Sequence, residues 1–369
     1  MKFTDVTGQE EIKQKLISSV KNGRISQALM FISPEGRGGL PLAIAFAQYL
    51  VCINKQENDS CGMCPPCHKM SKLIHPDIHF SFPVIKTNDK PISDDFISTW
   101  RTSVIENPYL GYFDWLEKMN AENKQGNISM AECHNIIKKI SLKSFEGKFK
   151  ILIQWLPEYL GKNGNSLLKI LEEPPEGTLF LFVTQNKDLI LNTIRSRTQQ
   201  ILLPPLKTNT IADQLISQFQ LEKQNALKIA EMAAGNFSES IRLYQSGQND
   251  HSIKFIEWLR LCWTNDGVDV FKWVQDFSSK GREYQKDFLQ SGIRLIRENV
   301  LWNNKLPELN HLGDDEIEFS KNFSVLMNEN RASKIYQLLD KSYYYVERNT
   351  NPKVLFFQLT LQLNQILTK

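Results

Sequence analysis

The sequence has little net charge, no long apolar run and few cysteines outside one segment. Its 369 residues carry a formal net charge of +3, which neither demands nor excludes a nucleic acid partner. No apolar run reaches the ~18 residues of a membrane span, and the N-terminus lacks the apolar core of a signal peptide. We therefore expect a cytoplasmic protein with no membrane partner. The apolar fraction of 41% and charged fraction of 23% are typical of globular domains.

Four of the six cysteines lie within one short segment, with the spacing C-x8-C-x2-C-x2-C. They are Cys52, Cys61, Cys64 and Cys67. In a reducing compartment such a cluster favours a metal over disulfides. Four thiolates complete a tetrahedral shell with no open position, so we expect structural zinc, with His68 and His75 as spare ligands. The alternative is four reduced thiols in a loop. Cys133 and Cys262 stand alone and are expected to be buried apolar residues.

The segment after the apolar run 28–32 has the form of a phosphate-binding loop. It reads Ser-Pro-Glu-Gly-Arg-Gly-Gly-Leu over residues 33–40, and a helical run, 42–51, follows. Gly36 and Gly38 keep the glycine-rich character of such a loop. A working loop ends in Lys and Ser/Thr, which bind phosphate and Mg²⁺. Here those positions are Gly39 and Leu40, which can do neither. We predict a degenerate loop that binds no ATP.

Residues 1–205 have an α/β pattern. Two short apolar runs, 149–153 and 179–183, are typical of buried strands. A helix expected over 164–172 separates them, and strand, helix, strand indicates a parallel sheet. Pro204-Pro205 marks a domain boundary. The four-cysteine module, 52–67, is inserted in this domain.

The rest of the chain is expected to be helical. Residues 206–248 form a small helical domain that ends in a linker at 247–250, and 249–369 form an all-α domain. The segment 82–127 adds a partly helical excursion to the first domain. The expected helices cover 211–219, 224–234, 238–244, 251–263, 269–277, 284–302, 316–328, 332–345 and 353–367.

Five motifs, together with the loop and the cysteine module, resemble in their order those of the bacterial clamp-loader subunits of DNA polymerase III, a group of AAA+ ATPases. Besides the loop and the cysteine module, they are Val6-Thr7-Gly8-Gln9, Ser26-Gln27-Ala28-Leu29, His75-Pro76-Asp77, the Asn165-to-Pro175 run and Thr193-to-Thr198. The resemblance covers some 190 residues. It implies a RecA-like parallel sheet with helices, followed by a helical lid and an all-α collar used for oligomerisation.

The resemblance also assigns the ATPase positions. The metal-binding acidic pair falls on Gln154 and Trp155, and Glu158 is not expected to substitute. The sensor arginine falls on Ser238, and we interpret Arg242 as a surface residue. This combination favours the non-hydrolysing delta′ type over the gamma/tau motor type.

One group that has a catalytic role in the family is present in this sequence. Ser196-Arg197 lies where the family donates an arginine finger to a neighbouring subunit, although Thr198 replaces the family's cysteine. Such a finger contributes about 10³–10⁵ in rate. The alternative for Arg197 is an ion pair with a surface carboxylate. Five lysines cluster at the apolar run 149–153 and just before it, and they either face DNA or form a solvated helix face: Lys138, Lys139, Lys143, Lys148 and Lys150.

The resemblance thus implies a delta′-type subunit that assembles with gamma/tau and delta subunits and loads the sliding clamp on primed DNA during DNA replication. Its own contact with the clamp is expected to be indirect or weak. Two alternatives stay open: an active gamma/tau-like ATPase, and a zinc-dependent nucleic-acid-binding module.

Overall fold

The computed structural model describes residues 1–85, 92–119, 125–245, 250–304, 312, 314–348 and 350–368. The chain divides into two compact units, Met1–Arg242 and Leu243–Lys369. Each unit has a hydrophobic core of its own.

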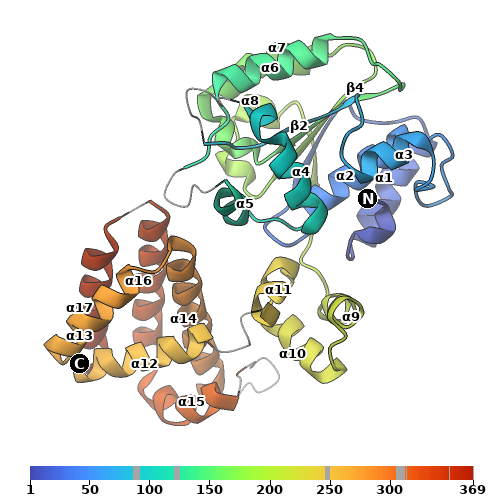
Figure 1. The fold of residues 1–369 in the computed structure, drawn as a ribbon. Helices are drawn as coiled ribbons and strands as arrows, with labels where there is room; N and C mark the ends of the chain where they lie inside the picture. The colour runs from blue at the N-terminus through green and yellow to red at the C-terminus, as the bar shows by residue number, and fades with distance from the viewer. Residues whose placement is uncertain are drawn as a thin grey trace. The chain divides into compact units, whose positions relative to one another are not determined.

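The first unit is built on a parallel sheet of five strands in the order β2-β3-β4-β1-β5 (Figure 1). The strands are β1 Ala28–Ile32, β2 Ile78–Ser81, β3 Lys150–Trp155, β4 Thr178–Thr184 and β5 Gln199–Leu202. Every residue of β1, β3 and β4 is buried, because helices cover both faces of the sheet. The α/β class and the two strands expected from the sequence are confirmed.

Alternate residues of each strand belong to two separate cores. Phe31, Ile153 and Leu181 pack on one face with α1 Glu10–Lys21 and α2 Gly39–Val51. On the opposite face, Met30, Leu152 and Phe182 pack with α6 Met130–Ser141 and with residues 157–172. In that last segment the expected helix is shorter than predicted. A 3₁₀ stretch, Pro157–Leu167, precedes α7 Leu168–Glu172.

The excursion at 82–127 is partly helical, as expected, and it belongs to the sheet core. Its described part contains a 3₁₀ turn, Ser93–Phe96, with α4 Ile97–Glu106 and α5 Tyr112–Lys118. Trp100 and Trp115 are both fully buried against Phe82. A bridge between Val84 and Asn127 closes the excursion at its base. Its residues 86–91 and 120–124 lie outside the described residues.

Three helices follow the sheet, and all but the last three residues of the third lie in the same unit: α9 Thr208–Phe219, α10 Lys223–Met232 and α11 Phe237–Gln245. They match the helices expected for a lid. Most of the linker expected at 247–250 lies outside the described residues. The division of 1–242 into two domains stays a prediction, because these helices group with the sheet in one compact unit.

All regular structure in the described part of the second unit is helical, as expected. The helices are α12 Asp250–Thr264, α13 Gly267–Ser278, α14 Arg282–Asn303, α15 Asp314–Leu326, α16 Glu329–Glu347 and α17 Pro352–Thr368. Their core is aromatic: Trp258, Phe288 and Phe356 are fully buried. Trp263 and Trp302, in contrast, are partly exposed. Among the described residues of the whole chain, no helix is long and apolar enough to cross a membrane.

Candidate functional site

The phosphate-loop segment joins β1 to α2, as the sequence predicts, but the chain itself occupies its hydrogen-bonding groups. Gly36 and Gly38 adopt φ values of +72° and +88°, which only glycine takes up without strain. The hydroxyl oxygen of Ser33 accepts the N–H of Gly39 at 3.0 Å. That N–H opens α2, and in a nucleotide-binding loop the N–H groups at this end face phosphate.

Position 39 has no room for a side chain. A Cβ atom on Gly39 would lie 2.5 Å from Cβ of Ser33 and 3.0 Å from Cγ1 of Val183. Tyr109 and Trp155, both buried, line the remaining hollow over the loop. The volume of that hollow is about 30 Å³, which is room for roughly one water molecule.

The two positions expected to have lost their carboxylates lie at the end of β3. Gln154 is fully buried, and its amide donates to the carbonyl oxygen of Ser81 at 3.4 Å. Trp155 places its side chain in the wall of the hollow. The carboxylate of Glu158 accepts the backbone N–H of Gln185 at 2.9 Å, and burial raises its pKa. Glu158 is not among the residues that line the hollow.

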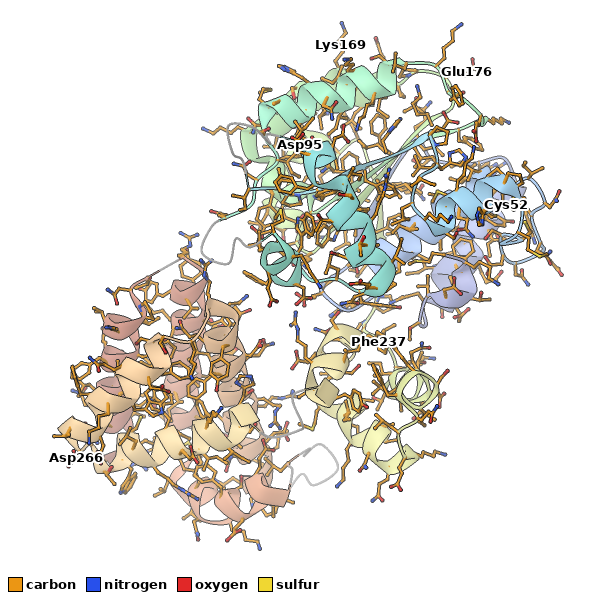
Figure 2. The ribbon with its side chains drawn as sticks, in the orientation of Figure 1. Cys52, Asp95, Lys169, Glu176, Phe237 and Asp266 are labelled. Carbon is orange, nitrogen blue, oxygen red and sulfur yellow. The ribbon has the colours of Figure 1, made fainter. Side chains whose placement is uncertain are left out.

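The first turn of α11, which begins at Phe237 (labelled in Figure 2), lies directly on the loop. The N–H of Phe237 donates to the carbonyl oxygen of Gly36 at 3.0 Å. A Cβ on Gly36 would lie 1.7 Å from Oδ1 of Asn236, so this approach requires glycine. Ser238, the residue at the sensor position, donates its hydroxyl to the carbonyl oxygen of Tyr109 at 2.8 Å and is buried.

The interpretation of Arg242 as a surface residue is wrong. Its guanidinium is half-buried and donates to Glu35 of the loop at 2.8 Å and to Asp114 at 3.3 Å. One helical turn separates Arg242 from Ser238, so both lie on the face of α11 that meets the loop. We call Glu35, Asp114 and Arg242 the lid latch. One feature of the sequence could have pointed to this latch: Glu35 places a carboxylate in a phosphate-type loop, where it would repel a phosphate.

The expected finger residues lie at the end of α8 Asn192–Arg195. Arg197 is exposed, and its guanidinium bonds Glu172 and the carbonyl oxygen of Thr193, both at 2.8 Å. Ser196 is exposed as well, and its hydroxyl donates to the same carbonyl oxygen at 3.3 Å. In this chain alone, Arg197 therefore forms the surface ion pair that the alternative interpretation predicts.

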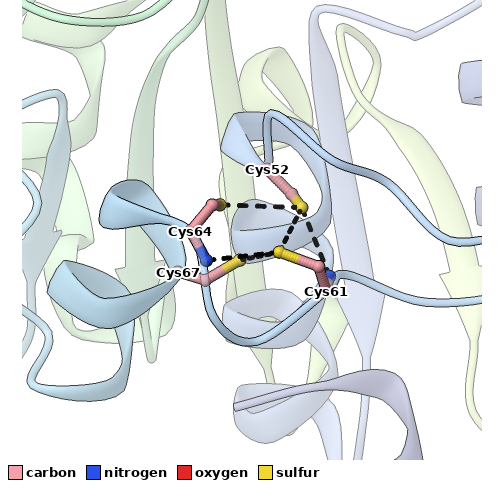
Figure 3. A group of neighbouring side chains, drawn as sticks. All are labelled: Cys52, Cys61, Cys64 and Cys67. Carbon is pink, nitrogen blue, oxygen red and sulfur yellow. Dashed lines mark hydrogen bonds between the residues drawn. The ribbon is translucent and has the colours of Figure 1, made fainter.

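The four clustered cysteines converge as the sequence predicts (Figure 3). Cys52 follows the end of α2, whereas Cys64 and Cys67 lie at the start of α3 Pro65–Ser71. The Sγ–Sγ distances are 3.6 Å for Cys52–Cys61, 3.9 Å for Cys52–Cys64 and 4.0 Å for Cys61–Cys67. A tetrahedral zinc with Zn–S bonds of ~2.3 Å requires edges of about 3.8 Å. The geometry therefore fits a structural zinc ion.

Backbone N–H groups favour anionic sulfur at Cys61 and Cys64, whereas burial raises the pKa of Cys52 and Cys67. The N–H groups of Cys61 and Cys64 donate to Sγ of Cys52 and Cys61, each at 3.3 Å. The N–H groups of Cys64 and Met63 lower the pKa of the Cys61 thiol. Burial alone would raise the pKa of Cys64, but N–H groups outweigh it and lower that pKa to about 6. A metal bound here would be closed off by four thiolates and would stabilise the fold, not take part in a reaction.

The spare ligands are not part of this cluster, and the two isolated cysteines are buried as expected. Neither His68 nor His75 belongs to a metal-binding group among the described residues. Nδ1 of His75 accepts the N–H of Asp77 at 3.2 Å. Cys133 and Cys262 are both fully buried.

The five lysines do not form one surface. Lys150 is buried at the start of β3. It therefore neither faces DNA nor belongs to a solvated helix face, and both interpretations are wrong for this residue. Lys139 pairs with Asp94, whereas Lys138, Lys143 and Lys148 are exposed.

The fold is an AAA+-type nucleotide-binding fold. A phosphate-loop turn follows β1 of a parallel sheet, and a helical segment packs on that turn. The family model described as "DNA polymerase III, delta subunit" matches residues 8–207, which are 200 of the 369 residues. The chain therefore belongs to this family of DNA polymerase III subunits.

Named relatives agree with this assignment. The delta′ subunit of Bacillus subtilis is 24% identical over 74% of this chain and 71% of its own length. The delta′ subunit of Escherichia coli is 23% identical over 63% of this chain and 58% of its own. The tau/gamma subunit of Haemophilus influenzae is 25% identical over 65% of this chain, but only 30% of the relative is covered. The resemblance to clamp-loader subunits is thus confirmed.

Among solved structures, a gamma subunit-related protein of Thermotoga maritima has 14% identity and a TM-score of 0.44, with 97% of this chain and 99% of that chain covered.

Proposed function

We propose that this chain is a non-catalytic, delta′-type subunit of the clamp loader of DNA polymerase III. It assembles with gamma/tau and delta subunits and helps to load the sliding clamp on primed DNA during DNA replication. It binds no ATP itself, donates Arg197 to the ATP site of a neighbour, and touches the clamp indirectly or weakly. The observation that carries this proposal is the lid latch, in which Arg242 pairs with Glu35 of the loop.

The latch supports the proposal because it places a carboxylate where a nucleotide would bring phosphate. A lid arginine that would attract phosphate is held instead by Glu35 and Asp114. A triphosphate entering this loop would meet the like charge of Glu35 and a wall formed by Trp155. The loop also lacks the lysine and the hydroxyl that bind phosphate and Mg²⁺. These features of the loop disfavour both the binding and the hydrolysis of ATP.

Arg197 supplies the catalytic part of the proposal. Its side chain is exposed and its partner Glu172 is also solvent-accessible, so exchanging that ion pair for a phosphate costs about 1 kcal/mol or less. In the assembly, the guanidinium would neutralise charge that develops on the neighbour's γ-phosphate. Ser196 lies next to it and fixes the end of α8 through its bond to Thr193.

Zinc has a structural role in the proposal. The cysteine cluster joins the end of α2, the helix that follows the loop, to α3. Zinc held by Cys52, Cys61, Cys64 and Cys67 would fix the far end of α2 in the assembled protein.

Reconstitution tests the proposal. The chain is mixed with the gamma/tau and delta subunits of the same organism, and complex formation is measured by size-exclusion chromatography. Labelled ATP binding to the isolated chain is measured by filter binding. We expect a stable complex and no ATP binding. Tight Mg²⁺-dependent binding of ATP would support an active gamma/tau-like ATPase instead, and failure to join the complex would overturn the proposal altogether.

A further inference from the structure

The loop between α6 and β3 presents two apolar side chains to solvent. Leu142 is 62% exposed and Phe145 is 82% exposed. Single exposed apolar residues are common on protein surfaces. These two lie three residues apart on one short loop, residues 142–149, which we call the docking loop. Two contacts hold the loop, one to its backbone and one to the side chain of Glu146.

The first tie is to Asp77, at the entrance of β2. The carboxylate of Asp77 accepts three successive backbone N–H groups of the docking loop: Phe145 at 2.5 Å, Glu146 at 2.8 Å and Gly147 at 2.9 Å. Asp77 is itself buried, and its carbonyl oxygen accepts the N–H of Ile151 in β3 at 2.9 Å. The base of Phe145 is therefore fixed to the edge of the sheet.

The second tie is to the cysteine module. Lys69 of α3 forms an ion pair with Glu146 of the docking loop. The same short helix carries Cys67 and begins directly after Cys64. The position of Lys69 therefore depends on the cluster that holds α3. A rigid loop loses little conformational entropy on binding, so an apolar side chain held this way is prepared for a partner.

Most exposed charges near the two apolar side chains are positive; the exposed Glu176, next to Gly177 and so close to Lys148, is an exception. Lys138, Lys143 and Lys148 are exposed and form no ion pair among the described residues. The carboxylate of the loop, Glu146, is neutralised by Lys69. A complementary partner surface would therefore carry Asp or Glu side chains around an apolar pocket.

We propose that the docking loop binds a protein partner within the assembly, with Leu142 and Phe145 entering an apolar pocket bordered by carboxylates, and that the cysteine module holds the loop in position. This inference rests on the proposed function only in that the partner is one of the protein chains of the assembly. Single-stranded nucleic acid fits less well, because it stacks on successive aromatic rings, and Leu142 offers none.

A photo-crosslinking residue at position 145 tests the proposal in the reconstituted assembly of this chain with gamma/tau, delta, sliding clamp and primed DNA. The same residue at position 189, where Leu189 is 65% exposed at the end of the 3₁₀ turn Lys187–Leu189, is the control. We expect position 145 to crosslink to one protein chain, at a segment that combines apolar and acidic residues, more strongly than position 189. Crosslinking to DNA, or to nothing, would overturn the proposal. Failure of the assembly to form, seen by size-exclusion, would instead overturn the proposed function.

The affinity of this chain for the crosslinked partner then tests two roles separately: docking by Phe145, and support of the loop by the cysteine module. Phe145→Ala is expected to weaken binding about ten- to thirtyfold, and thermal unfolding checks that the variant is folded. Lys69→Ala is expected to weaken binding by a smaller factor, and so is removal of the metal, because both release the loop. Lys162→Ala, on an exposed lysine away from the loop, is the matched control. Unchanged affinity in Phe145→Ala contradicts the docking role, and unchanged affinity in Lys69→Ala contradicts the role of the cysteine module.

Discussion

Arg242 of α11 donates a hydrogen bond of 2.8 Å to Glu35 of the loop between β1 and α2. These residues are 207 positions apart in the chain, and their ion pair joins the lid helices to the loop. In a working loop, phosphate binds at the N-terminus of the helix that follows. Here Glu35, in the loop before α2, and Asp114 both pair with the guanidinium of Arg242.

Loss of the latch should loosen α11. In Arg242→Ala we expect faster hydrogen exchange at the N–H of Phe237, because that N–H bonds Gly36 only while α11 stays on the loop. A double-mutant cycle with Glu35→Ala should give a coupling energy of about 0.5–1 kcal/mol, since the pair is only half-buried. The pair Arg195–Asp188 is the control and should show less coupling, because its carboxylate is 72% exposed, against 23% for Glu35. Exchange at Phe237 that stays at the rate of the unaltered chain contradicts the latch.

Restoring the lost loop residues should not restore ATP binding. The double change Gly39→Lys with Leu40→Thr forces a Cβ to within 2.5 Å of Cβ of Ser33, which costs about 1–3 kcal/mol of stability. Gly267→Ala is the matched control, because a Cβ there meets nothing within 4 Å and should leave stability nearly unchanged. Calorimetric titration with ATP measures binding, and urea unfolding measures stability. Micromolar ATP binding by the double variant would show that the loop is not closed by its surroundings.

One zinc ion per chain should co-purify, bound by the cysteine cluster. Removing it with a chelator should lower the free energy of unfolding by several kcal/mol, since metal binding stabilises only the folded chain. Cys64→Ser should lose the metal, whereas Cys133→Ala should keep it, because Cys133 is buried away from the cluster. Atomic absorption gives the metal content and thermal melting gives the stability. Metal-free protein with an unchanged melting temperature contradicts the structural role.

Asp77 should make the stability depend on pH. Burial alone would raise the pKa of Asp77, but the N–H groups of Phe145, Glu146 and Gly147 outweigh it and hold the pKa below its usual value. Its stabilising contribution is therefore fully present above the unfolded-state pKa of ~3.9. It is lost as pH falls through the lower pKa of the folded state.

Replacing Asp77 isolates that contribution. Asp77→Asn should lower the free energy of unfolding at pH 7 by about 2–3 kcal/mol, because charge-assisted hydrogen bonds to backbone N–H groups are lost. It should also flatten the decline in stability below about pH 4. Asp188→Asn, on an exposed carboxylate, should change stability by less than about 0.5 kcal/mol. Urea unfolding from pH 3 to 7 is the measurement, and equal pH profiles for the unaltered chain and Asp77→Asn would refute this assignment.

The sequence was sufficient for elements whose signal is local. The apolar runs at 149–153 and 179–183 became β3 and β4, since central parallel strands are buried on both faces and need continuous apolar residues. The spacing of the cysteines determined the cluster, because residues two apart on a turn reach the same ion. Strand β2 gave no such signal: it has four residues, and one of them is His79.

Long-range contacts could not be predicted in the same way. The latch joins three residues from distant segments, and nothing near Asp114 in the sequence points to the loop. Lys150 was grouped with exposed lysines although it falls in the apolar run 149–153, because the sequence does not show how the residues around it pack. For Arg197 the sequence left two interpretations open, and the ion pair with Glu172 in the isolated chain does not decide what it contacts in an assembly.

The most direct test of the account is the ATPase activity of the reconstituted complex with primed DNA, carrying Arg197→Ala in this chain alone. Turnover at the neighbouring ATP site should fall about 10³-fold. The ATPase activity of the whole complex should therefore fall by the fraction that this site contributes. Arg195→Ala, which removes the adjacent arginine paired with Asp188, should leave turnover unchanged. Full turnover in the Arg197→Ala complex, with assembly intact, would contradict the claim that this chain serves its neighbour's ATP site.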